Sequence, residues 1–214
     1  MLINSSDTLR VSSYAVRPEP VFKNAVVDTT ILTFVKTETE CNHFYSTRLN
    51  RKKGNDFSLQ KLVENLAFAD VREFLLYGRI PKIGTQIECS ILKKIRSNKV
   101  VANFKSPKGS PIYYRFAGGR YFKVITNYTT NSSAERCLLL DKEYADVIGC
   151  LLSSSLSFWF YQIYSDNHNW KAGEIENFPI PQIDDTIGIL YGLTKEEIEF
   201  IKNYEIEFRM AGDN

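Results

Sequence analysis

The chain lacks most patterns that identify an enzyme or a metalloprotein. Its 214 residues contain no G-x-G-x-x-G, P-loop, H-E-x-x-H or G-x-S-x-G motif. Histidine is scarce, since His43 and His168 are the only two. Four widely spaced cysteines form no C-x-x-C pair, namely Cys41, Cys89, Cys137 and Cys150. These absences argue against a zinc site and a disulfide framework, and they favour free thiols in a reducing cytoplasm. Because no basic segment followed by an apolar core stands near the start, secretion is not expected either.

Acidic residues are missing from one long stretch of the chain. Residues 89–134 hold no Asp or Glu and nine basic residues. The nine are Lys93, Lys94, Arg96, Lys99, Lys105, Lys108, Arg115, Arg120 and Lys123. Residues 1–140 carry 22 Lys and Arg against 11 Asp and Glu, a net +11, whereas residues 141–214 carry 5 against 14, a net −9. This asymmetry points to a polyanion as the partner of the first part, because clustered cations bind phosphates by counterion release and arginine can read guanine edges.

Long uncharged segments are also rare, and only one is long enough to be considered as a membrane span. Residues 147–165 contain no charged side chain. Five serines interrupt this run and a polar SDNHNW segment follows it, which favours a buried helix pair over a membrane span. With 43% apolar and 24% charged residues, the composition is that of an ordinary globular protein. The fold class that we predict, with the mixed helices and strands described next, is α+β.

Periodicity and capping signals predict the elements. Ala25–Val35 is expected to form a buried strand after a polar turn over 11–20, and Ser58–Tyr77 a helix ended by Gly78 and Pro81. Capping boxes at Thr85–Glu88 and Thr194–Glu197 predict two amphipathic helices. The remaining predictions are three short strands and a broken helix pair: Val100–Phe104, Ile112–Phe116, Tyr121–Thr126, a helix capped by Asp141 through Leu152, and a helix over Leu156–Tyr164.

The second and third of these strands define two faces. With Gly118-Gly119 as a two-residue hairpin loop, alternation separates a basic face from a core face. The basic face carries Tyr113, Arg115, Arg120, Phe122 and Val124, whereas the core face carries Ile112, Tyr114, Phe116, Tyr121 and Ile125, with Lys123. SPKGSP, which contains Lys108, is expected to be the turn that joins the first two strands.

Several segments, taken in order, resemble one enzyme family. VSSYAVRPEPVF followed by ILTFVKTE resembles the end of the catalytic domain in N6-adenine DNA methyltransferases of bacterial restriction–modification systems. Three further segments resemble the TaqI-like target-recognition domain of these enzymes, namely RIPKIGTQIECSILKKI, IYYRFAGGRYFKVIT and LLSSSLSFWFYQIYSDNHNWKAGEIENFPIP. LYGLTKEEIEFIKNYEIEFRM is similar to the terminus of the type II and type IIG enzymes.

The chain also departs from that family. Such enzymes bind S-adenosylmethionine through a glycine-containing loop and hold the flipped adenine with an Asn/Asp-Pro-Pro-Tyr/Phe motif, and this sequence has neither. The resemblance therefore implies the C-terminal part of such an enzyme, inactive by itself, with both motifs upstream of Met1. It implies the last strands of a Rossmann-like domain over 1–45, a DNA specificity domain over 46–181 and a helical tail over 182–214. No catalytic, cofactor-binding or metal-binding residue is expected in this chain, and S-adenosylmethionine belongs to the intact enzyme.

The implied partners are double-stranded DNA and the missing N-terminal catalytic domain, in cis or as a separate chain, with no membrane. Tyr113, Arg115 and Arg120 are the expected base-edge or backbone contacts, with Lys123 beside them. The expected phosphate anchors are Lys93, Lys94, Arg96, Lys99 and Lys105. A second backbone clamp, on a loop, is expected from Arg48, Arg51, Lys52 and Lys53.

Two alternatives remain open from the sequence. In the first, the chain is an interaction subunit: its acidic half, residues 141–214, docks a basic partner, and its basic half contacts RNA or single-stranded DNA by stacking bases on exposed aromatics. In the second, it is an inert truncated fragment with an exposed apolar patch, which insolubility or dimerisation through residues 11–36 would reveal.

Overall fold

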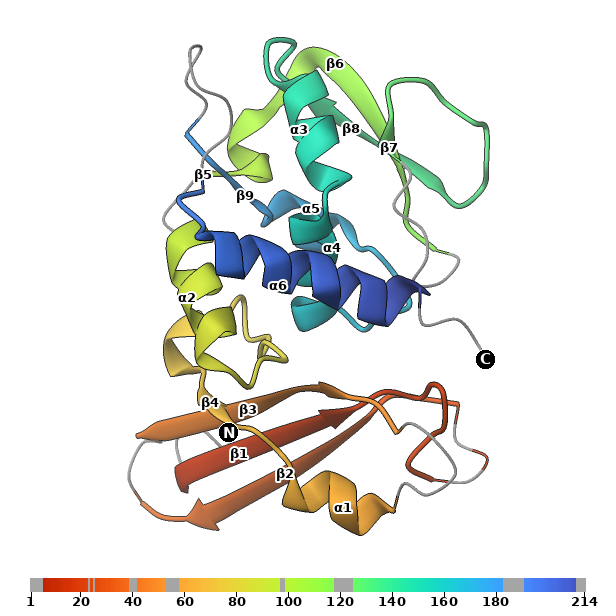
Figure 1. Cartoon of the computed structure of the whole chain (residues 1–214). Helices are drawn as coiled ribbons and strands as arrows, with labels where there is room; N and C mark the ends of the chain where they lie inside the picture. Colours follow the sequence, from red (N-terminus) through yellow and green to blue (C-terminus); the bar gives the residue numbers. More distant parts are fainter. Residues whose placement is uncertain are drawn as a thin grey trace. The chain divides into compact units, whose positions relative to one another are not determined.

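The computed structural model describes residues 6–22, 24, 26–38, 42–52, 58–96, 99–117, 125–182 and 191–210. Its small sheets and short helices make it an α+β protein, as the sequence predicts (Figure 1). The chain divides into two compact units, Met1–Ser90 (the first unit) and Ile91–Asn214 (the second unit). The division into 1–45, 46–181 and 182–214 is a functional one and stays a prediction.

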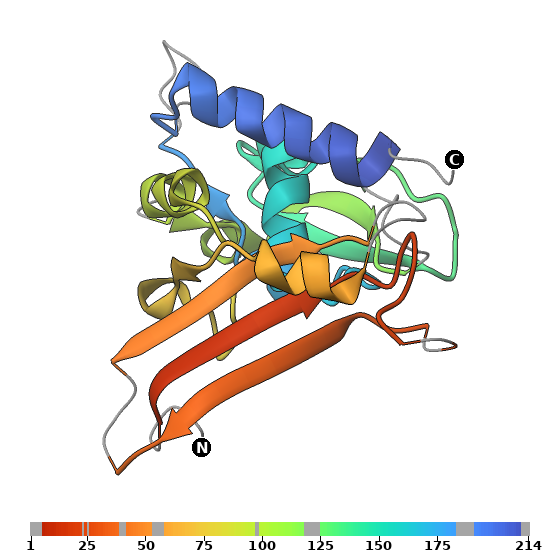
Figure 2. The ribbon, with the colours of Figure 1, turned by 60° about the horizontal axis from the view of Figure 1, so that its bottom comes forward.

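The first unit is built on a four-stranded sheet. Its strands are β1 (Ser6–Tyr14), β2 (Thr29–Lys36), β3 (His43–Asn50) and β4 (Ala69–Asp70), in the order β2-β1-β3-β4 (Figure 2). β1 pairs antiparallel with β2 and parallel with β3. Leu9, Val11 and Phe44 are buried on one face of the sheet. Arg10, which lies between Leu9 and Val11 in the sequence, is exposed on the other face. The sheet therefore has a core side and a side that carries polar groups.

The strand prediction for Ala25–Val35 is right in type and wrong in burial. The strand covers Thr29–Lys36, and every residue of it after Thr29 is exposed. β2 has one hydrogen-bonded neighbour among the described strands, so its β-branched sequence forms a strand at the sheet edge. The turn expected over 11–20 is also partly wrong, because residues 11–14 belong to β1.

The helix expected over Ser58–Tyr77 does not form as one element. Helix α1 covers only Leu59–Glu64, β4 follows, and a 3-10 turn covers Arg72–Phe74. Val71 and Phe74 are buried as expected, but the amide of Val71 donates to the carbonyl of Phe44 at 2.7 Å. Contact with β3 thus satisfies the backbone at Val71, and the helical spacing of the apolar residues does not correspond to a helix here.

A buried carboxylate organises the start of helix α2 (Gln86–Ile95). The predicted capping box is confirmed: Glu88 Oε2 accepts from the hydroxyl of Thr85 at 2.9 Å and from the amides of Gly84 and Thr85 at 2.9 and 3.1 Å. Glu88 Oε1 lies 3.3 Å from Nε of Arg48, which is in β3 and not on a loop as expected. Burial raises the pKa of Glu88, while Arg48 and these hydrogen bonds act to lower it. A side chain at Gly84 would meet the carbonyl oxygen of Ala67 at 2.5 Å, so this close approach requires glycine.

The second unit surrounds an aromatic core. A three-stranded sheet in the order β7-β6-β8 and a strand pair β5–β9 pack with four helices (Figure 1). The strands are β5 (Lys99–Val100), β6 (Lys105–Arg115), β7 (Ile125–Thr126), β8 (Glu135–Leu140) and β9 (Pro179–Ile180). The helices are α3 (Ala145–Leu152), α4 (Ser155–Tyr164), α5 (Ala172–Glu176) and α6 (Lys195–Glu205, continued by a π-helical turn over Ile206–Met210). Every residue of α4 after Ser155 is buried.

The predicted helix pair is confirmed in its break and wrong in its first cap. The break at the serines is confirmed, since the hydroxyl of Ser154 caps α4 by accepting from the amide of Ser157 at 3.3 Å. Asp141 is not the N-cap of α3: its carbonyl accepts from the amides of Tyr144 and Ala145, so a turn precedes the helix. Among the described residues no single helix is long and apolar enough to cross a membrane. Only α3 and α4 taken together, bent by 65°, pass that test of length and composition.

Two strand predictions in the second unit need correction. Val101–Phe104 is a 3-10 turn, because the side chain of Asn103 accepts from the amide of Val100 at 2.8 Å and starts a tight turn. SPKGSP does not join two strands but lies inside β6, where Lys105 and Ser110 both pair with Leu140. Gly109 sits directly against the carbonyl of Leu140, a contact that any β-carbon would prevent. The Gly118-Gly119 hairpin and residues 121–124 lie outside the described residues, and β8 was not predicted.

We expect the Glu88–Arg48 pair to stabilise the first unit. Glu88→Ala removes the acceptor for three local donors and leaves Arg48 without its carboxylate, so the free energy of unfolding should fall by about 3 kcal/mol. That figure is at the low end for a buried pair because the Arg48 side chain is 31% exposed. Glu88→Gln keeps an acceptor oxygen and should lose about half as much. Urea unfolding measures both, and equal stability of the Ala variant and the parent chain would contradict this role.

Candidate nucleic-acid interface

The exposed face of β6 carries two of the predicted DNA contacts. Ile112 and Tyr114 are buried, and Tyr114 packs edge-on against Trp170 with ring centroids 6.0 Å apart. Tyr113 is half-buried and Arg115 is exposed, so the predicted alternation of core and basic faces is confirmed for these residues. The third contact predicted with them, Arg120, and its neighbour Lys123 lie outside the described residues.

An acidic residue faces Arg115 across the sheet. Glu135 of β8 is the Cα partner of Arg115, so the two side chains lie on the same face. Its carboxylate accepts from the hydroxyls of Thr129 and Thr130, both at 2.5 Å, and from the amide of Thr130 at 2.8 Å. These hydrogen bonds lower the pKa of Glu135, and the one from Thr129 has the largest effect. The face is therefore not purely basic but offers a donor and an acceptor side by side.

Arg136, the residue next to Glu135, contacts the aromatic ring of Phe116. Its guanidinium lies 3.9 Å from the ring centroid of Phe116, close enough for a cation–π contact. Nη1 of Arg136 also donates to the carbonyl of Glu135 at 2.8 Å, which holds the side chain in place. The sequence analysis missed Arg136 because the residue lies just outside the acid-free stretch. The strand β8 was missed for a different reason, because its sequence ERCLLL shows no strict alternation of polar and apolar residues.

Acidic residues of the C-terminal half engage two of the five expected phosphate anchors. Lys94 Nζ lies 2.7 Å from Glu197 Oε2, and Lys105 Nζ lies 2.8 Å from Glu176 Oε1. Glu197 is itself buried and completes the confirmed capping box with Thr194. Part of the charge asymmetry between the two halves is thus compensated inside the second unit.

The other three expected anchors are exposed cations. Lys93 and Arg96 stand at the end of α2, where positive charge also suits the helix dipole. Burial raises the pKa of Tyr164, and the nearby charge of Arg96 acts to lower it. Lys99 lies with its Nζ 6.0 Å from the ring centroid of Phe104. Lys108, which belongs to the irregular part of β6, is exposed as well.

The described residues that were expected to clamp the DNA backbone from the first unit contact other residues of that unit. Arg48 pairs with Glu88, Lys52 Nζ lies 2.6 Å from Glu19 Oε2, and Arg51 Nε donates to the carbonyl of Arg17 at 3.4 Å. Lys53 lies outside the described residues. Arg48 is therefore placed to hold the fold rather than a phosphate.

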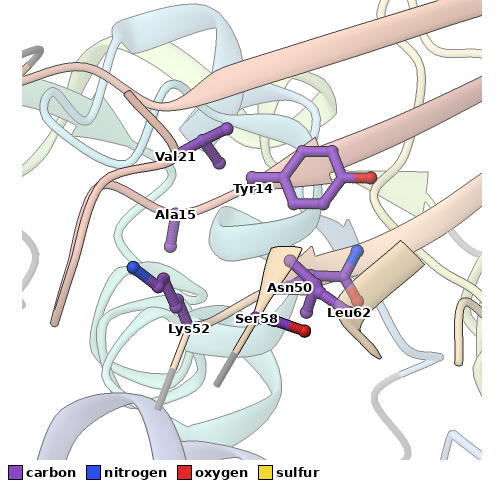
Figure 3. Close-up of a pocket in the computed structure, with 7 residues that line it drawn as sticks. All are labelled: Tyr14, Ala15, Val21, Asn50, Lys52, Ser58 and Leu62. Carbon is purple, nitrogen blue, oxygen red and sulfur yellow. The ribbon is translucent and has the colours of Figure 1, made fainter. Parts of the chain in front are cut away.

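Close to Lys52 the first unit is hollowed by a cavity of about 230 Å³ (Figure 3). The lining residues are Tyr14, Ala15, Val21, Asn50, Lys52, Ser58 and Leu62. Its polar groups serve the fold: the amide of Asn50 donates to the carbonyls of Ser13 and Arg48, and the hydroxyl of Ser58 caps α1 by accepting from the amide of Lys61. Two polar side chains of the lining, Asn50 and Ser58, are thus engaged within the fold.

The polar side of the first-unit sheet carries an aromatic cluster that sequence reasoning missed. The guanidinium of Arg10 lies 5.9 Å from the ring centroid of Tyr45 and 6.0 Å from that of Phe68. His43 stacks on Tyr45 with centroids 5.9 Å apart, and its Nδ1 lies 3.9 Å from Asp70 Oδ2. Three separate segments of the chain supply these residues, so no local pattern announces the cluster.

Metal-binding and reactive groups are sparse in the part of the chain that the structure describes. There, no three His, Cys, Asp or Glu side chains come together in a way that could hold a metal ion. Of the described cysteines, Cys89 is a buried free thiol, and Cys137 and Cys150 are exposed free thiols. No family model, curated protein or solved structure matches this chain. The geometry of the two aromatic and basic surfaces is therefore the evidence on function.

Removing the charge of Glu135 should strengthen binding to a mixed-sequence duplex. Glu135→Gln keeps acceptor capacity for Thr129 and Thr130 but removes a negative charge opposite Arg115, so affinity at low salt should rise about two- to five-fold. Glu143→Gln is the matched control, because Glu143 is exposed in the turn before α3. Fluorescence anisotropy measures both. An unchanged affinity, or an equal gain in the control, would remove Arg115 and Glu135 from the interface.

Proposed function

We propose that this chain binds double-stranded DNA in a sequence-specific manner, as the recognition portion of an S-adenosylmethionine-dependent N6-adenine DNA methyltransferase of a restriction–modification system. The observation that carries the proposal is the exposed face of β6, where Tyr113 and Arg115 lie on one strand whose opposite face is packed through Tyr114 against Trp170. A rigid scaffold that presents a few polar side chains is what base reading requires. The sequence resemblance to target-recognition domains points to the same segment.

The pair formed by Arg115 and Glu135 suggests how bases are read. A two-stranded ribbon fits the major groove, where arginine donates to O6 and N7 of guanine and a carboxylate accepts from N4 of cytosine. Arg115 and Glu135 are cross-strand neighbours, so together they match the donor and acceptor edges of a G·C pair. Glu135 thereby weakens unspecific attraction and adds discrimination. Glu135→Gln should accordingly bind mixed sequences better and discriminate among them less.

The remaining cations would position the duplex without reading it. Lys93, Arg96, Lys99 and Lys108 are exposed and lie in the acid-free stretch. Lys94 and Lys105 would have to leave Glu197 and Glu176 before they could contact phosphate, so their contribution should be smaller. In this proposal residues 1–45 of the first unit contribute the last strands of a Rossmann-like catalytic domain. The parallel pairing of β1 and β3 within a mixed sheet is compatible with that origin.

Duplex binding is tested by fluorescence anisotropy across a salt series, with a mixed-sequence duplex of about 30 base pairs. Six phosphate contacts would give a log–log slope of about −5. Lys99→Ala should reduce the magnitude of the slope by about 1, whereas Lys94→Ala, whose ammonium is held by Glu197, should change it little. Arg115→Ala should cost about 1–3 kcal/mol on a preferred sequence selected from random duplexes. Absence of duplex binding at low salt would contradict the proposal.

The methyltransferase part of the proposal needs a second chain. In the proposed enzyme, a separate N-terminal catalytic portion supplies the S-adenosylmethionine site and the adenine pocket, while this chain holds the duplex during base flipping. Mixing this chain with the catalytic portion of a relative should restore transfer of labelled methyl groups to DNA, and neither part alone should be active. Persistent inactivity of the mixture, with duplex binding intact, would restrict the function to DNA binding.

The aromatic cluster of the first unit favours a second candidate function, binding of single-stranded nucleic acid. Tyr45, Phe68 and His43 offer ring faces beside the guanidinium of Arg10, and such surfaces stack unpaired bases. Competition between single-stranded and duplex oligonucleotides of equal length separates the two functions. Preference for single strands that is lost in Tyr45→Ala, and kept in Arg115→Ala, would favour this candidate over duplex recognition.

A further inference from the structure

Half of the large apolar side chains that are exposed in the described part of the chain lie in or before one strand, β2. Within β2, Ile31, Leu32, Phe34 and Val35 are 38%, 47%, 43% and 65% exposed. Phe22, Val26 and Val27, which precede the strand, are each more than half exposed. Because side chains alternate along a strand, the four residues of β2 lie on both faces of the sheet. An apolar surface of this kind marks an interaction site.

β2 is also an open edge of the sheet. Among the described strands it pairs with β1 alone, so the backbone groups along its other side lie on the outer margin of the sheet (Figure 2). Natural edge strands are usually protected by charges, prolines or bulges, yet residues 29–35 contain no charge and no proline. The register with β1 is regular from Leu9 to Tyr14, so no bulge interrupts the paired part of β2 from Thr29 to Phe34.

Charges bound this apolar strand with opposite signs at its two ends. Asp28 precedes it and Lys36 ends it, eight positions apart. The Oδ1 atom of Asp28 accepts from the amide of Val16 at 2.8 Å, which fixes the carboxylate at the start of the strand. A strand with an acid at one end and a base at the other is complementary to itself when it runs antiparallel to a copy.

We propose that two copies of this chain pair antiparallel along β2, about a twofold axis at Leu32, and form one continuous sheet. In that register Leu32 lies beside the partner's Leu32, Thr30 beside the partner's Phe34, and Asp28 beside the partner's Lys36. On the opposite face Ile31 lies beside the partner's Thr33, and Val35 beside the partner's Thr29. Cross-strand pairs of β-branched, aromatic and oppositely charged residues are those that stabilise antiparallel sheets. A symmetric contact of one surface with itself closes as a dimer and leaves no further β2 edge.

Sedimentation equilibrium of the full chain without DNA tests the pairing. Because an inert fragment would also dimerise through residues 11–36, duplex binding is measured on the same sample, and a dimer that binds duplex excludes the inert fragment. We expect twice the 24.6 kDa mass of one chain, with dissociation on dilution. Leu32→Lys places two like charges together on the twofold axis and should yield a monomer. Tyr128→Lys, which puts the same charge on an exposed aromatic of the second unit, should stay dimeric. A monomeric parent chain, or a dimer unaffected by Leu32→Lys, would overturn the proposal.

A charge variant tests the register and poses little risk to folding. Lys36→Glu changes an exposed residue at the end of the strand and places it beside the partner's Asp28, so the dimer dissociation constant should rise about ten-fold. Adding Asp28→Asn keeps an acceptor for the amide of Val16 and removes the repulsion without restoring the attraction, so part of the loss should be recovered. A dissociation constant that Lys36→Glu leaves unchanged would overturn this register. A monomer that pairs instead with a methyltransferase catalytic portion, in a complex lost in Leu32→Lys, would identify a different occupant of the β2 edge.

Discussion

Burial of helix α4 is the constraint on which the second unit depends. Its side chains from Leu156 to Tyr164 are all buried, so the helix can exist only with protein on every side. Phe160 packs edge-on against Phe178, and Tyr161 against Trp170. Trp170 in turn supports Tyr114 of β6. The exposed face that carries Tyr113 and Arg115 is therefore held from behind by an aromatic chain of contacts that starts at α4.

Charge in this protein is balanced largely by contacts between distant segments. Lys94 and Glu197 are 103 positions apart in the chain, and Lys105 reaches Glu176 over 71 positions. Excess positive charge in one half and excess negative charge in the other thus serve partly to join the elements of the second unit. At the end of the β6–β8 pair there remains a mixed surface, with Arg115 and the half-buried Tyr113 on β6 and the Glu135 carboxylate on β8. This mixture of charges is the basis of our proposal that the surface selects among DNA sequences and does not bind every polyanion alike.

Sequence reasoning succeeded where the signal was local. The serine break before α4 and the alternation of Ile112 to Arg115 both depend on residues within a few positions of one another. It failed for Ser58–Tyr77, where a short helix, a short strand and a 3-10 turn replace the expected helix and where Phe68, one of the apolar residues at helical spacing, is exposed. β1 and β8 were missed because polar or charged residues interrupt their alternation, and their pairing partners supply the strand geometry.

The sequence alone determined the two capping boxes, at Thr85–Glu88 and Thr194–Glu197, because each closes hydrogen bonds within one turn of helix. The same carboxylates acquired their second roles only in the tertiary structure, where Glu88 meets Arg48 and Glu197 meets Lys94. Tertiary structure also decided that β2 lies at an edge and that Glu135 faces Arg115. Strand order and register bring together residues that are far apart in the chain, and no pattern of neighbouring residues records that choice.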